Sequence, residues 1–270
     1  MKYAFFDIHA HIHGDEFNSG REALVQSCLQ DSIGFFTVGT DYSESERAVQ
    51  CALQYENVFS TVGIHPVDKV EVFDYERLKH LATNQKVVAI GECGLDYYWP
   101  AHHNWKDGEE FEKNRQKELF ESQINLALEL DLPLMIHGRP TKKSMDAYKD
   151  IIQILKGFKE KHGSLLRGNV HFFAGDLSTA KEFWDLGLTT SFTGVITFTH
   201  DYDEVIKNAP LEMLMAETDS PYATPVPHRG TTNTPLFVKF VYQRIAELKN
   251  INIEEVQKQF NENRKRVFGV

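Results

Sequence analysis

The sequence predicts an α/β protein whose fold is a (β/α)8 TIM barrel with extra C-terminal helices. Short, continuous apolar runs alternate with longer amphipathic stretches, and this alternation is typical of a parallel sheet covered by helices. Polar residues that can bind metal follow the ends of most apolar runs. The sequence has no glycine-rich dinucleotide or phosphate-loop fingerprint, which would have favoured a doubly wound sheet.

Eight apolar runs are rich in β-forming residues and are expected to be strands. They are residues 4–8, 34–38, 58–64, 87–90, 133–136, 169–173, 188–192 and 213–216. Helices are expected between them at residues 44–55, 75–83, 110–130, 144–161 and 178–186. Residues 235–249 and 253–268 are expected to form further helices that pack outside the barrel.

Length and composition predict a single domain over residues 1–270 in the cytoplasm. Barrel folds often run to about 200–250 residues as one domain. No stretch has the roughly 18 consecutive apolar residues of a membrane helix, and the N-terminus does not resemble a secretory signal. The three cysteines have no paired spacing, which favours a reducing compartment. We therefore expect no membrane association, and nothing indicates an obligate protein partner.

The net charge of −10 argues against a broad basic surface for nucleic acid. It does not exclude a nucleic-acid substrate, because salt screens surface charges beyond about 8 Å at physiological ionic strength. Bound divalent ions would supply local positive charge in a cleft. The charge therefore restricts where a nucleic acid could bind.

Ionisable side chains follow the expected strands closely. The first strand runs into Asp7, His9, His11 and His13, and later strands end near His65, Glu92, His137, His171, Glu217 and Asp219. In barrels of this kind the reacting groups lie at the carboxyl ends of several strands. These positions therefore predict an active site at that rim.

His9 and His11 are two residues apart on a strand, so both imidazoles are expected on one face, where they can hold a divalent metal ion. The alternative is an exposed surface strand, but the preceding Phe5 and Phe6 favour a buried one. Asp7 is expected to support the ligands from beneath, and His13 is expected to be a solvated histidine.

Glu92 lies at the end of a fully apolar strand, where a bare carboxylate would be costly to bury. A structural salt bridge is one explanation, and a bridging position between two metal ions is the other. His137 and His171 each follow an apolar strand and could be core histidines, but together with Glu92 they form a plausible second metal site.

Asp219 is predicted to bind the first ion and to accept the proton of the attacking water. Coordination to a divalent ion lowers the pKa of water from about 16 to about 7. A carboxylate with a pKa of about 4 is ionised at neutral pH and can accept that proton.

In addition, the sequence resembles the TatD family of hydrolases, in the amidohydrolase-like barrel superfamily. The motifs that carry the resemblance appear in the family's order over nearly the whole chain. They are DIHAH (7–11), GIHP (63–66), AIGECGLDYY (89–98), MIHGR (135–139), HFFAG (171–175), SFTGVITF (191–198), ETDSPY (217–222) and NENRKRVFG (261–269).

The resemblance implies two divalent metal ions, one held by His9, His11, Glu92 and Asp219 and one by Glu92, His137 and His171. It also implies Mg²⁺-supported deoxyribonuclease activity that trims strands from the 3′ end, with single-stranded DNA or 3′ ends as substrate. Imidazole–carboxylate sites also accept Zn²⁺, Mn²⁺ or Ni²⁺.

Several residues are expected to contact substrate. His65, Arg139 and the adjacent Tyr97 and Tyr98 occupy positions where the resemblance implies substrate or phosphate contacts. Arg229 also favours a phosphate. Trp99 and Trp105 could stack on a base, although packing in the core or in a lid explains them equally well.

The chain departs from the family's usual motifs where substrate would be held. Arg139 is followed by Pro-Thr in place of the usual Asp-Ala, Asn233 lies in TNTP in place of RNEP, and HFFAG replaces HCFSG or HCFTG. The segment 100–110 is longer than usual. These differences favour, as the alternative function, hydrolysis of a small amide, ester or phosphoester. A catalytically idle binding protein is a third hypothesis, and it predicts the loss of a ligand that the sequence retains.

Overall fold

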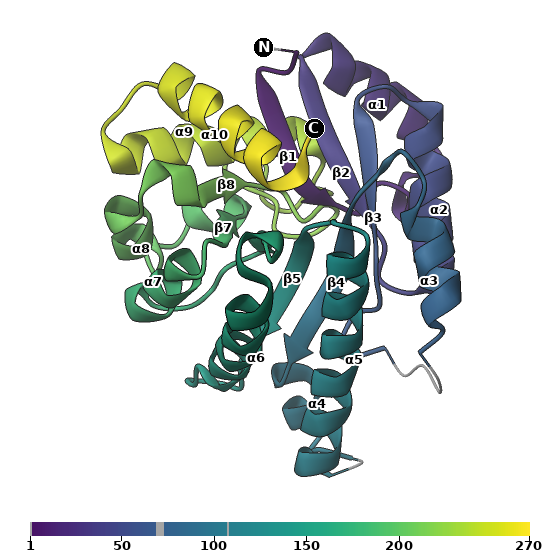
Figure 1. Ribbon diagram of the computed structural model, residues 1–270. Coiled ribbons are helices and arrows are strands. Elements are labelled where there is room, and N and C mark those ends of the chain that lie inside the picture. Colours follow the sequence, from purple (N-terminus) through teal and green to yellow (C-terminus); the bar gives the residue numbers. More distant parts are fainter. Residues whose placement is uncertain (1, 69–72, 107) are drawn as a thin grey trace.

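The computed structural model describes residues 2–68, 73–106 and 108–270, and its strands form one parallel eight-stranded sheet in sequence order (Figure 1). The strands are β1 (Phe5–Ala10), β2 (Ile33–Val38), β3 (Val58–Val62), β4 (Val87–Asp96), β5 (Leu134–Arg139), β6 (Gly168–Val170), β7 (Thr189–Phe192) and β8 (Leu214–Ala216). A parallel bridge between Ala10 and Ser220 brings β1 beside the end of β8. The sheet is a nearly closed barrel with helices between its strands, which confirms the predicted TIM-barrel fold.

Helices cover the outside of the sheet (Figure 1). They are α1 (Arg21–Gln30), α2 (Tyr42–Gln54), α3 (Tyr75–Ala82), α4 (Tyr98–His102), α5 (Glu109–Glu129), α6 (Asp146–His162), α7 (Leu177–Asp185), α8 (Asp203–Asn208), α9 (Val238–Lys249) and α10 (Ile253–Phe268). Short 3₁₀ turns lie at Asp15–Phe17, Gly163–Leu165, Gly194–Thr197, Leu211–Met213 and Pro235–Phe237. The predicted C-terminal helices are confirmed, and α1, α4 and α8 are additional to the prediction.

The C-terminal helices pack onto the first and last strands. The Tyr242 hydroxyl of α9 bonds both the amide and the carbonyl of Phe6 in β1. In α10, Asn263 donates to the carbonyl of Leu214 in β8. These contacts hold together the two strands at which the barrel closes.

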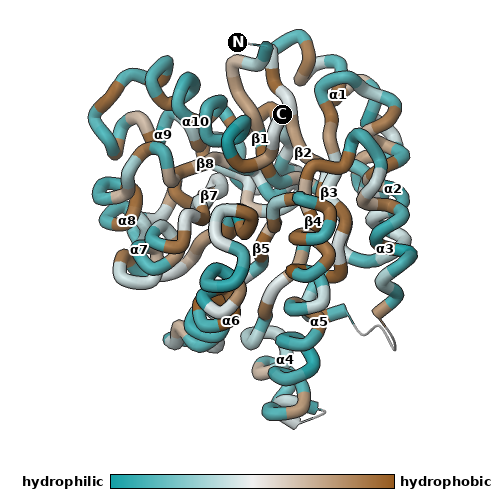
Figure 2. Tube along the Cα trace, in the orientation of Figure 1, coloured by the Kyte–Doolittle hydropathy of each residue, from teal (hydrophilic) through white to brown (hydrophobic). Residues whose placement is uncertain are grey.

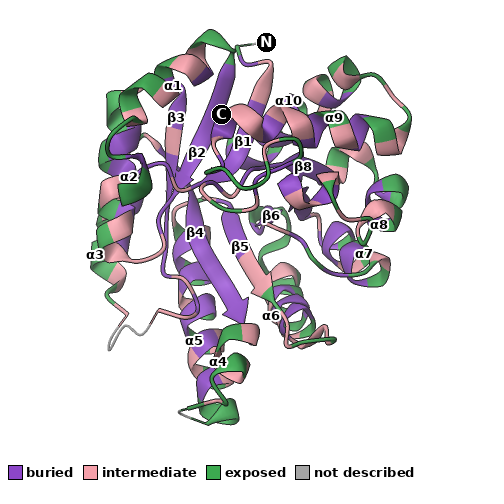
Figure 3. Ribbon diagram, turned by 180° about the vertical axis from the view of Figure 1, so that it is seen from behind, coloured by how far each residue is buried: buried purple, intermediate pink, exposed green. Residues whose placement is uncertain are grey.

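A large apolar cluster fills much of the barrel interior below its carboxyl-end rim. Side chains from several strands and from the end of α10 form one buried cluster, whose largest members are Tyr3, Phe6, Phe36, Met135, Met215 and Phe268. Figures 2 and 3 show hydrophobic, buried residues along the strands and hydrophilic, exposed ones on the outer helices. The interior is therefore packed, and the apolar cluster lies beneath the polar site.

Strand β4 runs six residues beyond its expected end at residue 90, because the apolar run marks only part of it. Two glycines allow the close approach of β5. A Cβ at Gly91 would lie 2.4 Å from the carbonyl oxygen of Met135, and one at Gly94 would lie 2.0 Å from that of His137. The extension carries Glu92 and Asp96 to the barrel mouth.

Within the described ranges, no helix combines the length and the apolar character needed to cross a membrane. The three cysteines, Cys28, Cys51 and Cys93, are buried and unpaired. Burial raises the pKa of the Cys28 thiol to about 12 and that of Cys51 to about 11, so both thiols are protonated at neutral pH.

Candidate metal centre

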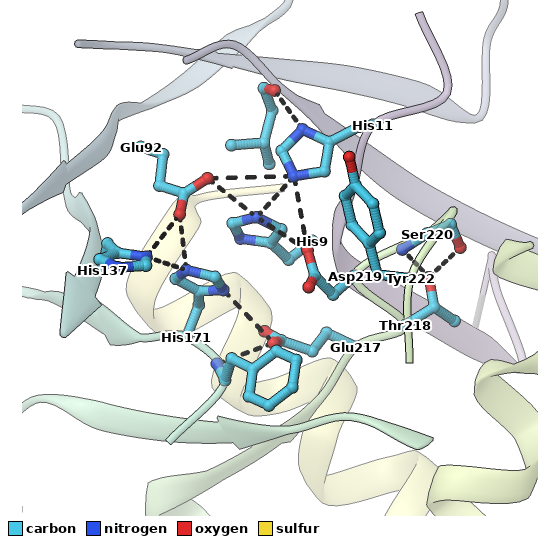
Figure 4. A network of polar contacts seen from close by, with 12 residues as sticks. His9, His11, Glu92, His137, His171, Glu217, Thr218, Asp219, Ser220 and Tyr222 are labelled. Atoms are coloured by element: carbon cyan, nitrogen blue, oxygen red, sulfur yellow. Dashed lines mark hydrogen bonds and ion pairs between the residues drawn. The ribbon is translucent and has the colours of Figure 1, made fainter. Parts of the chain in front are cut away.

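The first group of candidate ligands joins β1 to the loop after β8 (Figure 4). The Nε2 atoms of His9 and His11 are 3.3 Å apart. The Oδ1 atom of Asp219 lies 3.8 Å from the first and 3.4 Å from the second. The Nδ1 of His11 is 2.9 Å from the carbonyl oxygen of Val38. Because a carbonyl only accepts, Nδ1 carries a proton, and Nε2 is the ring nitrogen that a metal ion would bind.

Backbone contacts hold this group in place. Asp219 has a left-handed backbone (φ 53°), a conformation that non-glycine residues rarely adopt, and its amide donates to the carbonyl of His9 at 2.8 Å. Beneath it, the carboxylate of the fully buried Asp7 accepts hydrogen bonds from the amides of His9 and Thr218. Asp7 thus fixes the first strand to the last beneath the ligands, at the place predicted for it.

Glu92 lies between two sets of histidines, as Figure 4 shows. Its Oε2 atom is 3.4 Å from Nε2 of His9. Its Oε1 atom is 2.8 Å from Nδ1 of His137 and 2.8 Å from Nε2 of His171. Each oxygen therefore faces a different group of imidazoles, which is the arrangement a bridging carboxylate requires.

The charge on Glu92 follows from this environment. Burial alone would raise the pKa of the carboxyl, but the surrounding imidazoles of His171, His65 and His9 hold it well below its usual value. Glu92 is therefore ionised, and its two oxygens are available as ligands.

Two carboxylates orient the histidines of the second group. Asp96 Oδ2 lies 3.1 Å from Nε2 of His137, and Glu217 Oε1 lies 3.4 Å from Nδ1 of His171. Burial would raise the pKa of the Asp96 carboxyl, but its hydrogen bond to His137 and the imidazole charges lower it. Such carboxylate–histidine contacts fix ring orientation and increase ligand basicity.

Three further residues contact this cluster in ways that the sequence did not indicate. His65, predicted as a substrate contact, has its Nε2 3.5 Å from Oε1 of Glu92 and groups with Glu92 and His137 as a donor set. Glu217 groups with His9 and His171. Asp96 was not singled out, although it lies four residues beyond Glu92 on one strand and so shares its face.

The donor atoms fit divalent metal ions in type and in spacing. Nitrogen or oxygen ligands about 2.1 Å from a common tetrahedral centre lie about 3.4 Å from one another. The separations among His9, His11 and Asp219 are 3.3, 3.4 and 3.8 Å, close to that value. His137 Nδ1 and His171 Nε2 are likewise 3.3 Å apart. The fold therefore brings these side chains together as donors that could hold metal ions.

A cavity of about 900 Å³ opens above this cluster. Acidic residues (Asp15, Glu16, Glu44) and Arg47 line one part of it, and Arg139, at the end of β5, lines another. The exposed Tyr222 lies at its rim, next to Asp219 in the chain. The volume falls at the upper end of the range for small-ligand sites.

Comparison with known proteins identifies the family. A family model described as TatD related DNase matches residues 6–269. The chain belongs to the TatD family. It is 36% identical to the uncharacterized metal-dependent hydrolase YabD of Bacillus subtilis, over 98% of this chain and 99% of the relative. It is 32% identical to the uncharacterized metal-dependent hydrolase YcfH of Escherichia coli K12, over 98% of this chain and 95% of the relative.

A solved structure gives the same result. The crystal structure of YjjV, a TatD homologue from Escherichia coli K12, superposes with a TM-score of 0.86 and 27% identity, covering 100% of both chains. The relatives and the donor cluster together make this chain a metal-dependent hydrolase of the TatD family.

The structure of this TatD-family chain corrects three expectations. Tyr97 is fully buried, and its hydroxyl donates to Asp150, so it is not available to a substrate in the cavity. Arg229 is not among the residues that line the cavity, and its guanidinium lies 4.1 Å from the centroid of the Phe198 ring. His13 is buried, not solvated.

The contacts of His13 explain its burial. Its Nδ1 is 2.7 Å from the hydroxyl of Thr37, and its Nε2 is 2.9 Å from Oε2 of Glu44. It therefore supports the loop that follows the ligand His11.

The two tryptophans considered for base stacking lie in different environments. Trp105 is half-buried and packs with Tyr97, with ring centroids 6.2 Å apart. Trp99, on α4, is 49% exposed. Asn233, where the TatD motif departs from the usual one, is buried and donates to the carbonyls of Thr218 and Tyr222. It holds the loop that carries Asp219.

Proposed function

We propose that this TatD-family hydrolase is a deoxyribonuclease that removes nucleotides from the 3′ end of single-stranded DNA, with two divalent ions, Mg²⁺ supporting activity. The position of Arg139 carries the proposal. Its exposed guanidinium lines the cavity beside the ligand His137, and within the part of the chain that the structure describes no carboxylate lies within ion-pairing distance of it. A cation left unpaired beside a metal centre suits a phosphate, which a guanidinium binds through two parallel hydrogen bonds.

Different residues of the site have different roles in the proposed hydrolysis of the phosphodiester. Arg139 orients the phosphodiester, and Glu92 and the histidines hold the ions. Asp219 faces the cavity with a partly exposed carboxylate and accepts the proton of the attacking water. Divalent ions at such a site lower the pKa of water and stabilise charge on phosphate oxygens.

The dimensions and charge of the cavity support a strand end as substrate. A volume of about 900 Å³ accommodates the end of one strand. The acidic lining at Asp15, Glu16 and Glu44 disfavours a long polyanion across the whole mouth. The same acidic lining favours the second candidate, hydrolysis of a small amide, ester or phosphoester with a single anionic group that Arg139 would bind.

A time course on 5′-labelled single-stranded DNA with Mg²⁺ or Mn²⁺ tests the proposal. We expect a ladder that shortens from the 3′ end, abolished by EDTA and absent with Asp219→Asn. DNA that stays intact under every metal, while the protein still binds metal, would overturn the deoxyribonuclease proposal and favour the small-substrate alternative.

A further inference from the structure

A cluster of aromatic and imidazole rings lies at the catalytic end of the barrel, just past β4. We call it the α4 platform, formed by Tyr98, Trp99, His102 and His103. The rings of Tyr98 and His102 are nearly parallel, with an interplanar angle of 4°, and those of Trp99 and His102 meet at 30°. Figure 1 shows α4 beyond the arrowheads of β4 and β5.

Packing does not require these rings. Tyr97 and Trp105 fill the space between α4 and the core, whereas Trp99 keeps 49% of its surface exposed and His102 and His103 are also exposed. Two other exposed large apolar side chains have different surroundings. Phe198 carries the guanidinium of Arg229 on its ring, and Leu165 lies in the turn between α6 and β6, at the opposite end of the barrel.

Two contacts link the α4 platform to the metal centre. One carboxylate oxygen of Asp96 accepts from the amide of Trp99 at 2.8 Å, and the other lies 3.1 Å from Nε2 of His137. The guanidinium of Arg139 lies 4.1 Å from the centroid of the Tyr98 ring. The first contact anchors the start of α4 beside the ligand His137, and the second places the Tyr98 ring against the cation that lines the cavity.

We propose that the α4 platform stacks an unpaired nucleobase of the substrate strand, next to the phosphate bound by Arg139. This inference rests on the proposed deoxyribonuclease function and adds to it a site for the base. Proteins that bind single strands combine a cation that follows the backbone with aromatic rings on which bases stack. Every base has a flat π face, so such a site favours single strands without selecting a sequence.

The experiment compares intact oligonucleotides with oligonucleotides that carry an abasic unit at one of the last four positions before the 3′ end. The variants are Trp99→Ala and, as the matched control, Leu165→Ala, because both side chains are 49% exposed. We expect the abasic unit to lower kcat/KM of the unaltered protein roughly tenfold at one position. Trp99→Ala should cleave the intact strand as slowly as the abasic one, whereas Leu165→Ala should behave like the unaltered protein.

A second readout separates the failure of this inference from that of the proposed function. Quenching of tryptophan fluorescence by an oligothymidylate is measured with Asp219→Asn protein, with and without Trp99→Ala. If the DNA is cleaved but Trp99→Ala keeps the full dependence on the base, the platform proposal is overturned and the nuclease stands. If no DNA is cleaved but quenching requires Trp99, base stacking stands and the nuclease is overturned. If the DNA is not cleaved and the fluorescence is not quenched, both proposals are overturned.

Discussion

Two arginines line the cavity, one on α2 and one at the end of β5, and their surroundings differ. Arg47 contacts Oε1 of Glu44 at 2.8 Å and Oδ1 of Asp15 at 2.7 Å, and it donates to the carbonyl of His13. Arg139 lies over the ring of Tyr98, without a carboxylate partner among the described residues. The first arginine serves to hold the loop after β1, whereas the second keeps its charge available for a ligand.

We call the part of the lining around Arg47 the α2 wall and the part around Arg139 the β5 wall. The two walls therefore present different electrostatic potentials to a substrate. Around Arg47, the acidic side chains of Asp15, Glu16 and Glu44 outnumber the cation. The chain neighbours of Arg139 that line the cavity, Gly138 and Pro140, carry no charge, and no ion pair joins Arg139 to a carboxylate of the described residues. A phosphate is attracted to the β5 wall and repelled by the other, so substrate is expected to enter along β5 and α4.

Glu92 faces both groups of candidate ligands, so its loss should have the largest effect. Glu92→Gln keeps the shape but removes the charge that faces both groups of imidazoles. We expect activity to fall more than about 10³-fold, beyond the 10- to 100-fold range typical of residues that only support ligands. Activity assays and metal titration measure this, with circular dichroism to verify folding. Metal binding and turnover near the original values would contradict the bridging position.

Asp96 connects the α4 platform to the metal centre, and its loss should have the next largest effect. Asp96→Asn should lower metal affinity or activity by about 10- to 100-fold, because it weakens the contact that orients His137. Asp150→Asn is the control, since Asp150 accepts from the neighbouring Tyr97 but contacts no ligand. Calorimetric titration with Mn²⁺ measures the difference. Equal losses in the two variants would show that Asp96 acts only through folding.

The next largest effect is a difference in kcat/KM between variants of the two arginines. Arg139→Ala removes charged hydrogen bonds to phosphate, so we expect kcat/KM to fall about 10- to 100-fold. Arg47→Ala should change kcat/KM less than about threefold and should act mainly on thermal stability, because its partners are the protein's own groups. Steady-state assays and thermal melts check both. Similar kinetic losses in the two variants would remove the distinction between the walls.

The smallest effect is expected for Glu16, an exposed acid in the cavity lining. Glu16→Gln should lower KM for DNA by no more than about twofold, since single exposed charges contribute little. The change should disappear at high salt because screening removes it. KM values at low and high ionic strength measure this. A rise in KM would indicate that Glu16 attracts the substrate, for example through a cation.

Much of the site could be predicted because parallel strands converge at one rim. His9, His11, Glu92, His137, His171 and Asp219 follow strands that the apolar runs reveal, and the fold brings them together. Asp96 was missed because β4 continues beyond its apolar run, so a strand defined by hydrophobicity alone ended too early.

Other residues could not be placed because their roles depend on direction and partners. Tyr97 and Tyr98 are adjacent in sequence, yet one is fully buried and the other contacts Arg139. His13 is buried, and its ring contacts Thr37 and Glu44, which lie far along the chain. Arg47 and Arg229 contact side chains of the protein itself. These contacts depend on the tertiary fold, so the neighbouring sequence does not predict them.

The salt dependence of single-strand binding tests the difference between the two walls most directly. Binding of a labelled oligonucleotide is measured by fluorescence anisotropy over a range of salt concentrations, in Asp219→Asn protein so that the strand is not consumed. Each phosphate that is neutralised contributes about 0.7 to the slope of log affinity against log salt for single strands. We predict that adding Arg139→Ala makes this slope shallower by about 0.7 and that adding Arg47→Ala leaves it unchanged. An unchanged slope with Arg139→Ala, or a shallower one with Arg47→Ala, would contradict the assignment of the phosphate to the β5 wall.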